Sequence, residues 1–200
     1  MSTITMTHVT PEEYLALERN AETKSSYIDG EIFPMPGASF QHNKISFNLI
    51  LALGNRLKCQ AYHILSGDMR VRVSETGMYT YPDVCVVAGK PQLLNDGQLD
   101  NLLNPTVIIE VLSPSTEAFD RGRKWENYRQ LASLCEYVLV SQAEPLVERL
   151  LRDGEDWKRT EFRGLDAVVR FESLDCEVPL AEIYDQVLSA ELEPRPESLT

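Results

Sequence analysis

The segment TVIIEVLSPST at residues 106–116 places one acid, Glu110, inside a short apolar run that ends at a turn rich in Ser and Pro. The run has the length and the β-branched content of a buried strand. A second such run, YPDVCVV at 81–87, carries Asp83. An acid in such a run faces either a solvated side of the strand or a site that requires charge, because an unpaired buried carboxylate is costly. Asp83 is otherwise an acid that closes a turn after Pro82 and caps a neighbouring loop. Adjacent strands would bring Asp83 and Glu110 together.

A basic residue follows in a segment that is predicted to be a helix from Glu117 to Leu134. Asp120, Lys124 and Tyr128 recur at every fourth position, which puts all three on one helical face. Two acids and a lysine are suited to a divalent metal ion and a phosphate, where the lysine orients or deprotonates a water or neutralises charge. The same spacing is typical of a solvent-side salt bridge between Asp120 and Lys124, so both interpretations stay open.

The remaining pattern alternates between helices and strands, which indicates a mixed α/β class with a central sheet. A capping box at Thr10–Glu13 begins a short helix, Asp29–Gly30 is the turn of a hairpin over 25–36, and a helical stripe covers 39–56. Further strands are expected at 62–66, 69–73, 81–88, 136–141, 145–152, 157–163 and 167–171, with a loop at 90–105 and a last helix near 180–189.

Length and composition fit one soluble globular domain, which we assign to residues 8–188. The polar segment 189–200 is expected to be a mobile tail. The sequence has neither a basic, apolar leader nor a run long enough to span a bilayer, so a cytoplasmic protein is expected. Its four cysteines lack CxxC spacing, which favours buried free thiols over disulfides or a zinc site.

The net charge of −12 argues against tight, non-specific binding of duplex DNA, because an acidic protein repels a phosphate backbone. Basic clusters are present at 56–58, 70–72 and 121–124, while acidic residues concentrate in 144–161 and 182–197. These clusters are either solvated faces or a small positive patch beside an acidic pocket.

The motifs YPD at 81–83, IIEVLSPST at 108–116 and D-x-x-x-K-x-x-x-Y at 120–128 together resemble the Uma family of restriction-endonuclease-like proteins. This family is a branch of the PD-(D/E)XK nuclease superfamily. The YIDGEI hairpin at 27–32 and the helix that carries His42 also match, so the resemblance covers nearly the whole chain. It implies an α/β, restriction-endonuclease-like core with a mixed central sheet flanked by helices.

The resemblance also implies metal-dependent hydrolysis of phosphodiester bonds in DNA. Asp83 and Glu110 would be the ligands of Mg²⁺, with Mn²⁺ as a substitute, and analogy with related nucleases predicts a homodimer. The superfamily places its lysine two residues after the second acid, where this chain has Leu112. The base is therefore expected to come from Lys124 in the following helix.

Three residues are expected to support the site: Glu31, His42 and Tyr128. Glu31 is otherwise a hairpin acid in solvent, and His42 is otherwise a surface or capping residue. Two other functions remain open. A catalytically silent binding or assembly domain would keep the fold without the chemistry, and a hydrolase of a smaller phosphate-bearing substrate would use the same site.

Overall fold

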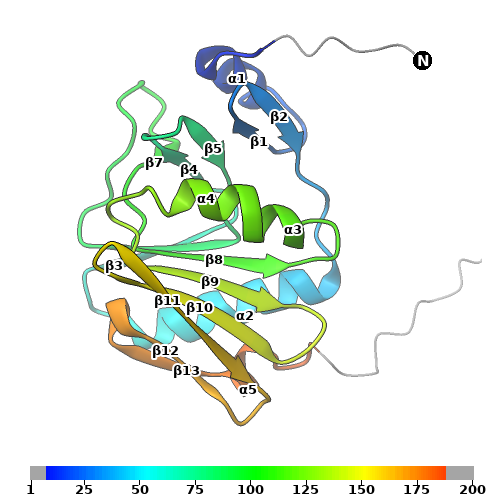
Figure 1. The fold of residues 1–200 in the computed structure, drawn as a ribbon, viewed down its shortest axis with the longest axis vertical. Coiled ribbons are helices and arrows are strands. Elements are labelled where there is room, and N and C mark those ends of the chain that lie inside the picture. Colours follow the sequence, from blue (N-terminus) through cyan, green and yellow to red (C-terminus); the bar gives the residue numbers. More distant parts are fainter. Residues whose placement is uncertain (1–7, 188–200) are drawn as a thin grey trace, which may run out of the picture.

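A six-stranded sheet forms the centre of the molecule (Figure 1). The computed structural model describes residues 8–187. The central sheet has the order β11-β10-β9-β8-β6-β3. Its β8–β9 pair is parallel and its other pairs are antiparallel, so the sheet is mixed, as predicted. Its strands are β3 (Tyr62–Ser66), β6 (Val84–Ala88), β8 (Val107–Leu112), β9 (Glu136–Ser141), β10 (Leu146–Asp153) and β11 (Asp156–Arg163).

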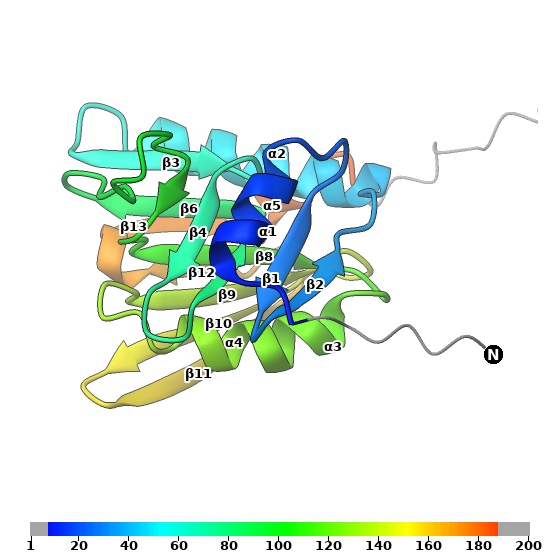
Figure 2. The same cartoon turned by 90° about the horizontal axis from the view of Figure 1, so that it is seen from above.

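A second sheet and a short helical segment cover one face of the central sheet (Figures 1 and 2). The sheet has the order β2-β1-β5-β4-β7, and helix α1 (Pro11–Glu18) packs on it through a cluster of tyrosines. Its strands are β1 (Ser25–Ile28), β2 (Glu31–Pro34), β4 (Arg70–Val73), β5 (Met78–Thr80) and β7 (Asn101–Leu102). The helical segment consists of α3 (Glu117–Phe119), the turn η1 (Asp120–Lys124) and α4 (Trp125–Tyr128).

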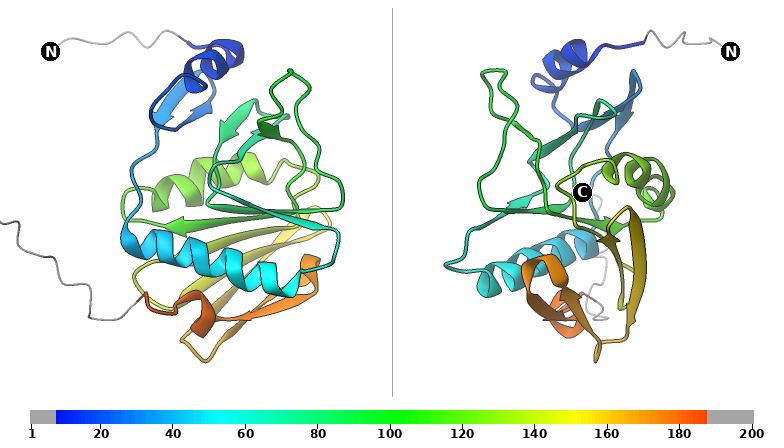
Figure 3. Two further views of the ribbon diagram at one scale, coloured as in Figure 1. Left: turned by 180° about the vertical axis from the view of Figure 1, so that it is seen from behind. Right: turned by 60° about the vertical axis from the view of Figure 1, so that its left-hand side comes forward.

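The long helix α2 (Phe40–Arg56) and a small hairpin cover the opposite face of the central sheet (Figure 3). The hairpin pairs β12 (Val168–Phe171) with β13 (Cys176–Pro179) around the 3₁₀ turn η2 (Glu172–Leu174), and α5 (Leu180–Ile183) follows it. Alternate residues of β6 and β8 face the two sides, as the two-residue period of a strand requires. Val84 and Ile109 contact the α2 side, whereas Cys85 and Ile108 contact the second sheet.

Most predicted elements are confirmed, including α1 with its capping box, the hairpin and α2. The strands expected at 62–66 and 69–73 are both present, but they belong to different sheets. The loop expected at 90–105 contains β7, which pairs with β4, and β5 and β13 were also missed. The structure adds that, within residues 8–187, no helix is long and apolar enough to cross a membrane.

The helix predicted to end at Leu134 ends at Tyr128. The Arg152 guanidinium on β10 donates hydrogen bonds to the carbonyls of Arg129, Leu131 and Leu134, at 2.7 to 2.9 Å. These carbonyls are satisfied from another strand, so this segment forms turns instead of a continued helix.

Two other expectations need correction. All four thiols are free, as predicted, but only Cys85 is buried. Cys59 lies in an exposed turn, and Cys135 and Cys176 are half-buried. The last helix ends at Ile183 rather than near 189, and the predicted tail 189–200 lies outside the described residues.

Candidate metal and phosphate site

Glu110 lies on β8, and Asp83 directly precedes β6, the neighbouring antiparallel strand. The β6–β8 ladder pairs Val84 with Ile109, and one further step places Asp83 opposite Glu110. Opposed residues of an antiparallel pair project from the same face of the sheet. The N–H of Val111 donates to Asp83 Oδ2 at 2.7 Å and ties the two strands together at this point. The strand pattern therefore predicted correctly that the two acids converge.

Lys124 completes a buried cluster with two carboxylates. Its Nζ lies 2.9 Å from Glu110 Oε1 and 2.8 Å from Asp120 Oδ1. The side chains of these three residues are 6%, 2% and 3% exposed, respectively. A solvent-side salt bridge between Asp120 and Lys124, which spacing alone had left open, is therefore wrong. The ion pair is buried and points toward Glu110.

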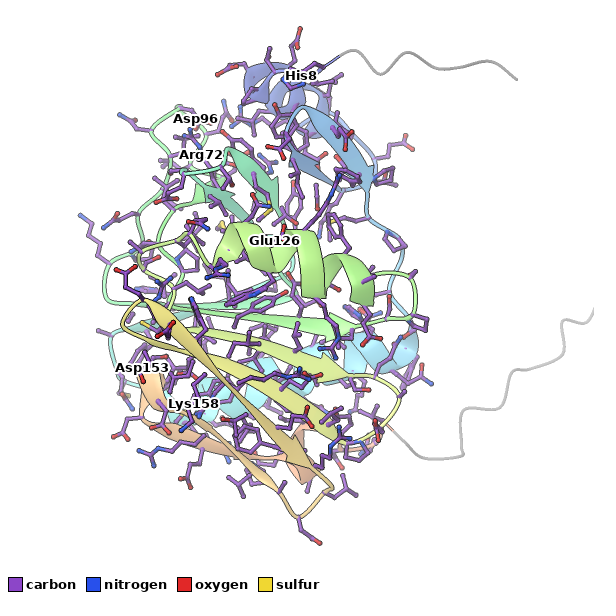
Figure 4. All side chains as sticks on the ribbon, in the orientation of Figure 1. His8, Arg72, Asp96, Glu126, Asp153 and Lys158 are labelled. Atoms are coloured by element: carbon purple, nitrogen blue, oxygen red, sulfur yellow. The ribbon has the colours of Figure 1, made fainter. Side chains whose placement is uncertain are left out.

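The cluster is carried by a turn of π-helix, η1, within a segment predicted to be α-helical. The Tyr137 hydroxyl donates to the Asp120 carbonyl at 2.9 Å and supports the first residue of this turn. Single π turns inside helices recur at functional sites. Lys124 and Tyr128 are buried on the inner side, whereas Glu126, labelled on α4 in Figure 4, is exposed.

Tyr128 fixes one oxygen of Glu110 and leaves the other available. Its hydroxyl donates to Glu110 Oε1 at 3.1 Å, the same oxygen that contacts Lys124. No described residue donates a hydrogen bond to Oε2. Because Glu110 lines a cavity of about 840 Å³ together with Asp83 and Lys124, Oε2 is the oxygen that can meet a ligand.

Burial and charge shift the proton affinities of this cluster. Burial raises the pKa of Glu110 to about 8, and the nearby Lys124 ammonium offsets part of this effect. For Lys124, burial disfavours the ammonium, but the charges of Glu110 and Asp120 outweigh it and raise the pKa. Lys124 therefore keeps its proton. A cation near Glu110 would favour the carboxylate, since an opposite charge stabilises the ionised form.

His42 brings the start of α2 to the site. Ser39 caps this helix by accepting the N–H of His42 at 3.1 Å. The His42 imidazole Nε2 lies 2.9 Å from Asp83 Oδ1, and both side chains are less than one-fifth exposed. His42 therefore lines the cleft and contacts an acid of the site, as one of the two interpretations of the sequence expected.

Glu31 does not join the other acids. Its carboxylate lies 3.1 Å from Arg123 Nη1, both side chains are largely exposed, and Glu31 does not line the 840 Å³ cavity. The hairpin acid in solvent is the interpretation that fits this geometry. The expected supporting role of Glu31 has no structural basis here.

The cavity carries an excess of negative charge. Glu22 and Asp68 bring the carboxylates in its lining to five, against two ammonium groups, from Lys24 and Lys124. Lys24 Nζ donates to the carbonyl of Gly67 at 2.8 Å and pairs with Asp68. Sequence reasoning missed these residues because they lie in loops that bear no motif.

The Uma2 family model, described as "Putative restriction endonuclease", matches residues 11–181. The chain belongs to the Uma2 family. Its relatives in Synechocystis sp. include "Uncharacterized protein sll1609", 39% identical over 164 residues that cover 82% of this chain and 92% of that protein. "Uncharacterized protein slr1290" is 35% identical over 159 residues, which cover 79% and 82% of the two chains.

A solved structure supports the fold of this Uma2 chain. The crystal structure of "a putative nuclease belonging to DUF820" from Anabaena variabilis superposes with a TM-score of 0.74 at 20% identity. The match covers 90% of this chain and 99% of the Anabaena chain. The predicted family and the predicted nuclease-like α/β fold are thereby confirmed.

The displaced lysine of this Uma2 chain reaches the acids from the helical segment. Leu112, at the position where the superfamily has its lysine, is 6% exposed and packs in the core between the two sheets. The Lys124 ammonium instead meets Glu110 from η1. Two acids and one ammonium are therefore kept together, although the ammonium comes from η1 and not from the strand that carries Glu110.

The donor set fits a hard divalent ion. Within residues 8–187, no three His, Cys, Asp or Glu side chains are grouped so that together they could hold a metal ion. Asp83 and Glu110 offer an open pair of carboxylates, and Mg²⁺ is typically held by one or two carboxylates while waters and phosphate oxygens complete its shell. A structural zinc site would need four protein ligands, usually thiolates and imidazoles, that leave no coordination position open.

Proposed function

We propose that the chain hydrolyses phosphodiester bonds in DNA with the help of Mg²⁺, for which Mn²⁺ would substitute. The observation that carries this proposal is the convergence of Asp83, Glu110 and the Lys124 ammonium on one cavity. Membership of the Uma2 family and the name given to the Anabaena protein support nuclease chemistry. A divalent ion between the two carboxylates would lower the pKa of a water and offset charge on the phosphoryl oxygens.

The residues of the chain prepare both carboxylates for this role. Lys124 and Tyr128 hold Glu110 Oε1, which directs Oε2 toward the ligand. The Val111 N–H holds Asp83 Oδ2, and His42 contacts Oδ1. Hydrogen bonds of this kind fix the orientation of a metal ligand before the metal arrives.

Lys124 is suited to stabilise negative charge. Two carboxylates hold its Nζ as an ammonium, and the cluster is shielded from solvent. A preformed positive charge in such a site favours a transition state in which charge builds on the phosphate oxygens or the leaving group. Neutralising this charge, rather than accepting a proton from water, is therefore the role that we assign to Lys124.

The charge of the cavity supports a requirement for a cation. Five carboxylates and two ammonium groups line it, so a phosphodiester would meet net repulsion on entering. A divalent ion on Asp83 and Glu110 would reduce that repulsion where the phosphate must bind. This function is consistent with the acidic composition, because attraction is needed only at the metal.

The proposal is tested by incubating the protein with plasmid, linear duplex and single-stranded DNA in Mg²⁺, Mn²⁺ or a chelator. We expect cleavage that needs the metal and is lost in Glu110→Gln. Cleavage that survives in Glu110→Gln would place the chemistry elsewhere. If the folded wild type cleaves none of these substrates, the catalytically silent domain becomes the better account.

A further inference from the structure

A largely exposed aromatic side chain lines the candidate site. Phe47 on α2 is 59% exposed, and it lines the same cavity as Asp83 and Glu110. Exposing a phenyl ring forgoes burial energy that a core position would gain. Figure 3 shows α2 running along the outside of the central sheet.

The cavity has an apolar wall beside its acidic floor. His42, Ser46 and Ile50 recur at every fourth position of α2 and therefore lie on one side of the helix, and Phe47, three residues before Ile50, lies at the edge of that side. All four residues line the cavity, so its apolar wall begins beside His42, the contact of Asp83. A ligand at the acids is therefore within the same cavity as the phenyl ring.

Many arginines on the rest of the surface lie within ion-pair distance of carboxylates. The pairs are Arg19 with Asp96 and Asp100, Arg56 with Glu182, Arg121 with Glu117 and Glu148, Arg159 with Glu148 and Glu161, Arg163 with Glu161, and Arg170 with Glu172. This pairing reduces the positive charge that the described surface can offer to the backbone of a duplex. The exposed Arg129, Lys58, Lys90 and Lys158 have no ion pair with another described residue.

We propose that Phe47 stacks on a nucleobase and that the substrate of the site is an unpaired DNA strand rather than an intact duplex. This inference rests on the proposed nuclease function and adds the substrate class. A paired base is covered by its neighbours in the stack, whereas an unpaired base presents a free face to an aromatic ring. Stacking also supplies affinity that does not depend on phosphate contacts, which suits a protein with a net charge of −12.

The inference is tested by direct binding, with Ca²⁺ replacing Mg²⁺ as an oxygen-liganded ion. Fluorescence anisotropy would compare a labelled single-stranded oligodeoxynucleotide with its duplex. We expect the single strand to bind more tightly than the duplex, and Phe47→Ala to weaken its binding roughly tenfold to hundredfold. Phe47→Trp should restore binding, since it keeps an aromatic face.

Phe40→Ala is the matched control, because Phe40 is also an exposed phenylalanine of α2, 54% exposed, but does not line the cavity. We expect its affinity for the strand to stay within about twofold of wild type, because no stacked base is lost. Phe47→Leu tests for an aromatic requirement, since leucine keeps apolar bulk without a ring face. Full binding in Phe47→Leu would overturn stacking.

The inference would also be overturned by unchanged binding in Phe47→Ala, by equal or better binding of the duplex, or by a folded wild type that binds no single strand. Sedimentation provides a second check. Loss of a dimer in both Phe40→Ala and Phe47→Ala would assign this face to a contact between copies of the chain. Binding without cleavage would remove the proposed function and leave only the stacking of Phe47 on an unpaired strand, whereas cleavage with Phe47→Ala unaffected would remove only the inference.

Discussion

Two buried glutamates of the central sheet, Glu110 on β8 and Glu136 on β9, are similar in burial but differ in their access to a cavity. Both are at most 2% exposed, and burial raises the pKa of both. Glu136 Oε1 accepts hydrogen bonds from the N–H and the hydroxyl of Ser173, at 2.7 and 2.6 Å. Its Oε2 is fully buried and lies 3.9 Å from Arg149 Nε. Glu136 is thus enclosed between the sheet and the small hairpin.

Glu110 differs because it opens on a cavity. Both acids meet a cation of the protein, but only Glu110 lines the 840 Å³ space and shares it with a second strand acid, Asp83. Burial and a raised pKa therefore do not distinguish a functional acid from a structural one in this fold. Access to one oxygen, and a second carboxylate beside it, make the difference.

The largest expected effect separates the two acids by activity. Glu110→Gln should lower the rate of DNA cleavage by a factor on the order of 10²–10³, because it removes a charge at the reacting centre. Glu136→Gln should leave the rate within about twofold of wild type, because its site does not reach the cavity. Initial rates on one substrate at saturating Mg²⁺ measure both. Equal losses in the two variants would end the distinction.

The comparison reverses when stability is measured. Glu136→Ala should lower the free energy of unfolding by about 3 kcal/mol, because it leaves buried Arg149 without its partner on the strand. Glu110→Gln should change this free energy by less than about 1 kcal/mol, since Lys124 retains Asp120 and the amide oxygen still accepts from Tyr128. Urea denaturation of both variants provides the values. A greater loss in Glu110→Gln would make that cluster chiefly structural.

A smaller effect is expected from the hydroxyl that positions Glu110. Tyr128→Phe should weaken Mg²⁺ binding about tenfold, because Glu110 Oε1 loses one of its two fixed contacts. Tyr27→Phe is the control, since it deletes a hydrogen bond of similar kind to the Val9 carbonyl, 2.7 Å long, far from the cavity. Titration calorimetry compares the two affinities. Unchanged affinity in Tyr128→Phe would show that Lys124 alone orients the carboxylate.

The smallest effect is expected at Glu31. Glu31→Gln should change metal affinity by less than about twofold and stability by less than about 0.5 kcal/mol, because its pair with Arg123 is exposed. Calorimetry and urea denaturation measure the two quantities. A large loss of metal affinity would mean that the hairpin closes over the site when the ion binds and that the role first expected for Glu31 is correct.

The parts of the fold that could be predicted are those with a local cause. The apolar runs around Asp83 and Glu110, the capping box at Thr10 and the stripe of α2 each contain their own pattern. The missed strand β7 is two residues long and depends on pairing with β4, which no local pattern reveals. The end of α4 likewise depends on Arg152, 24 residues farther along the chain.

The candidate site divides in the same way. Strand adjacency and helical spacing allowed Asp83, Glu110, Lys124 and Tyr128 to meet, and the resemblance to the Uma family implied that they form one site; their roles stay predictions. Burial of the Asp120–Lys124 pair could not be read from spacing, because a buried and an exposed pair have the same period. Glu31 matched a motif, but its position depends on the exposed partner Arg123.

Calorimetry of Mg²⁺ and Mn²⁺ binding to wild type, Asp83→Asn, Glu110→Gln and Glu136→Gln, with a short DNA strand present in a second series, decides whether Asp83 and Glu110 hold a metal. We expect wild type and Glu136→Gln to bind the ions and the two cavity variants to lose this binding, all four proteins remaining folded by circular dichroism. Equal binding to all four, or no binding to wild type in either series, would contradict this expectation.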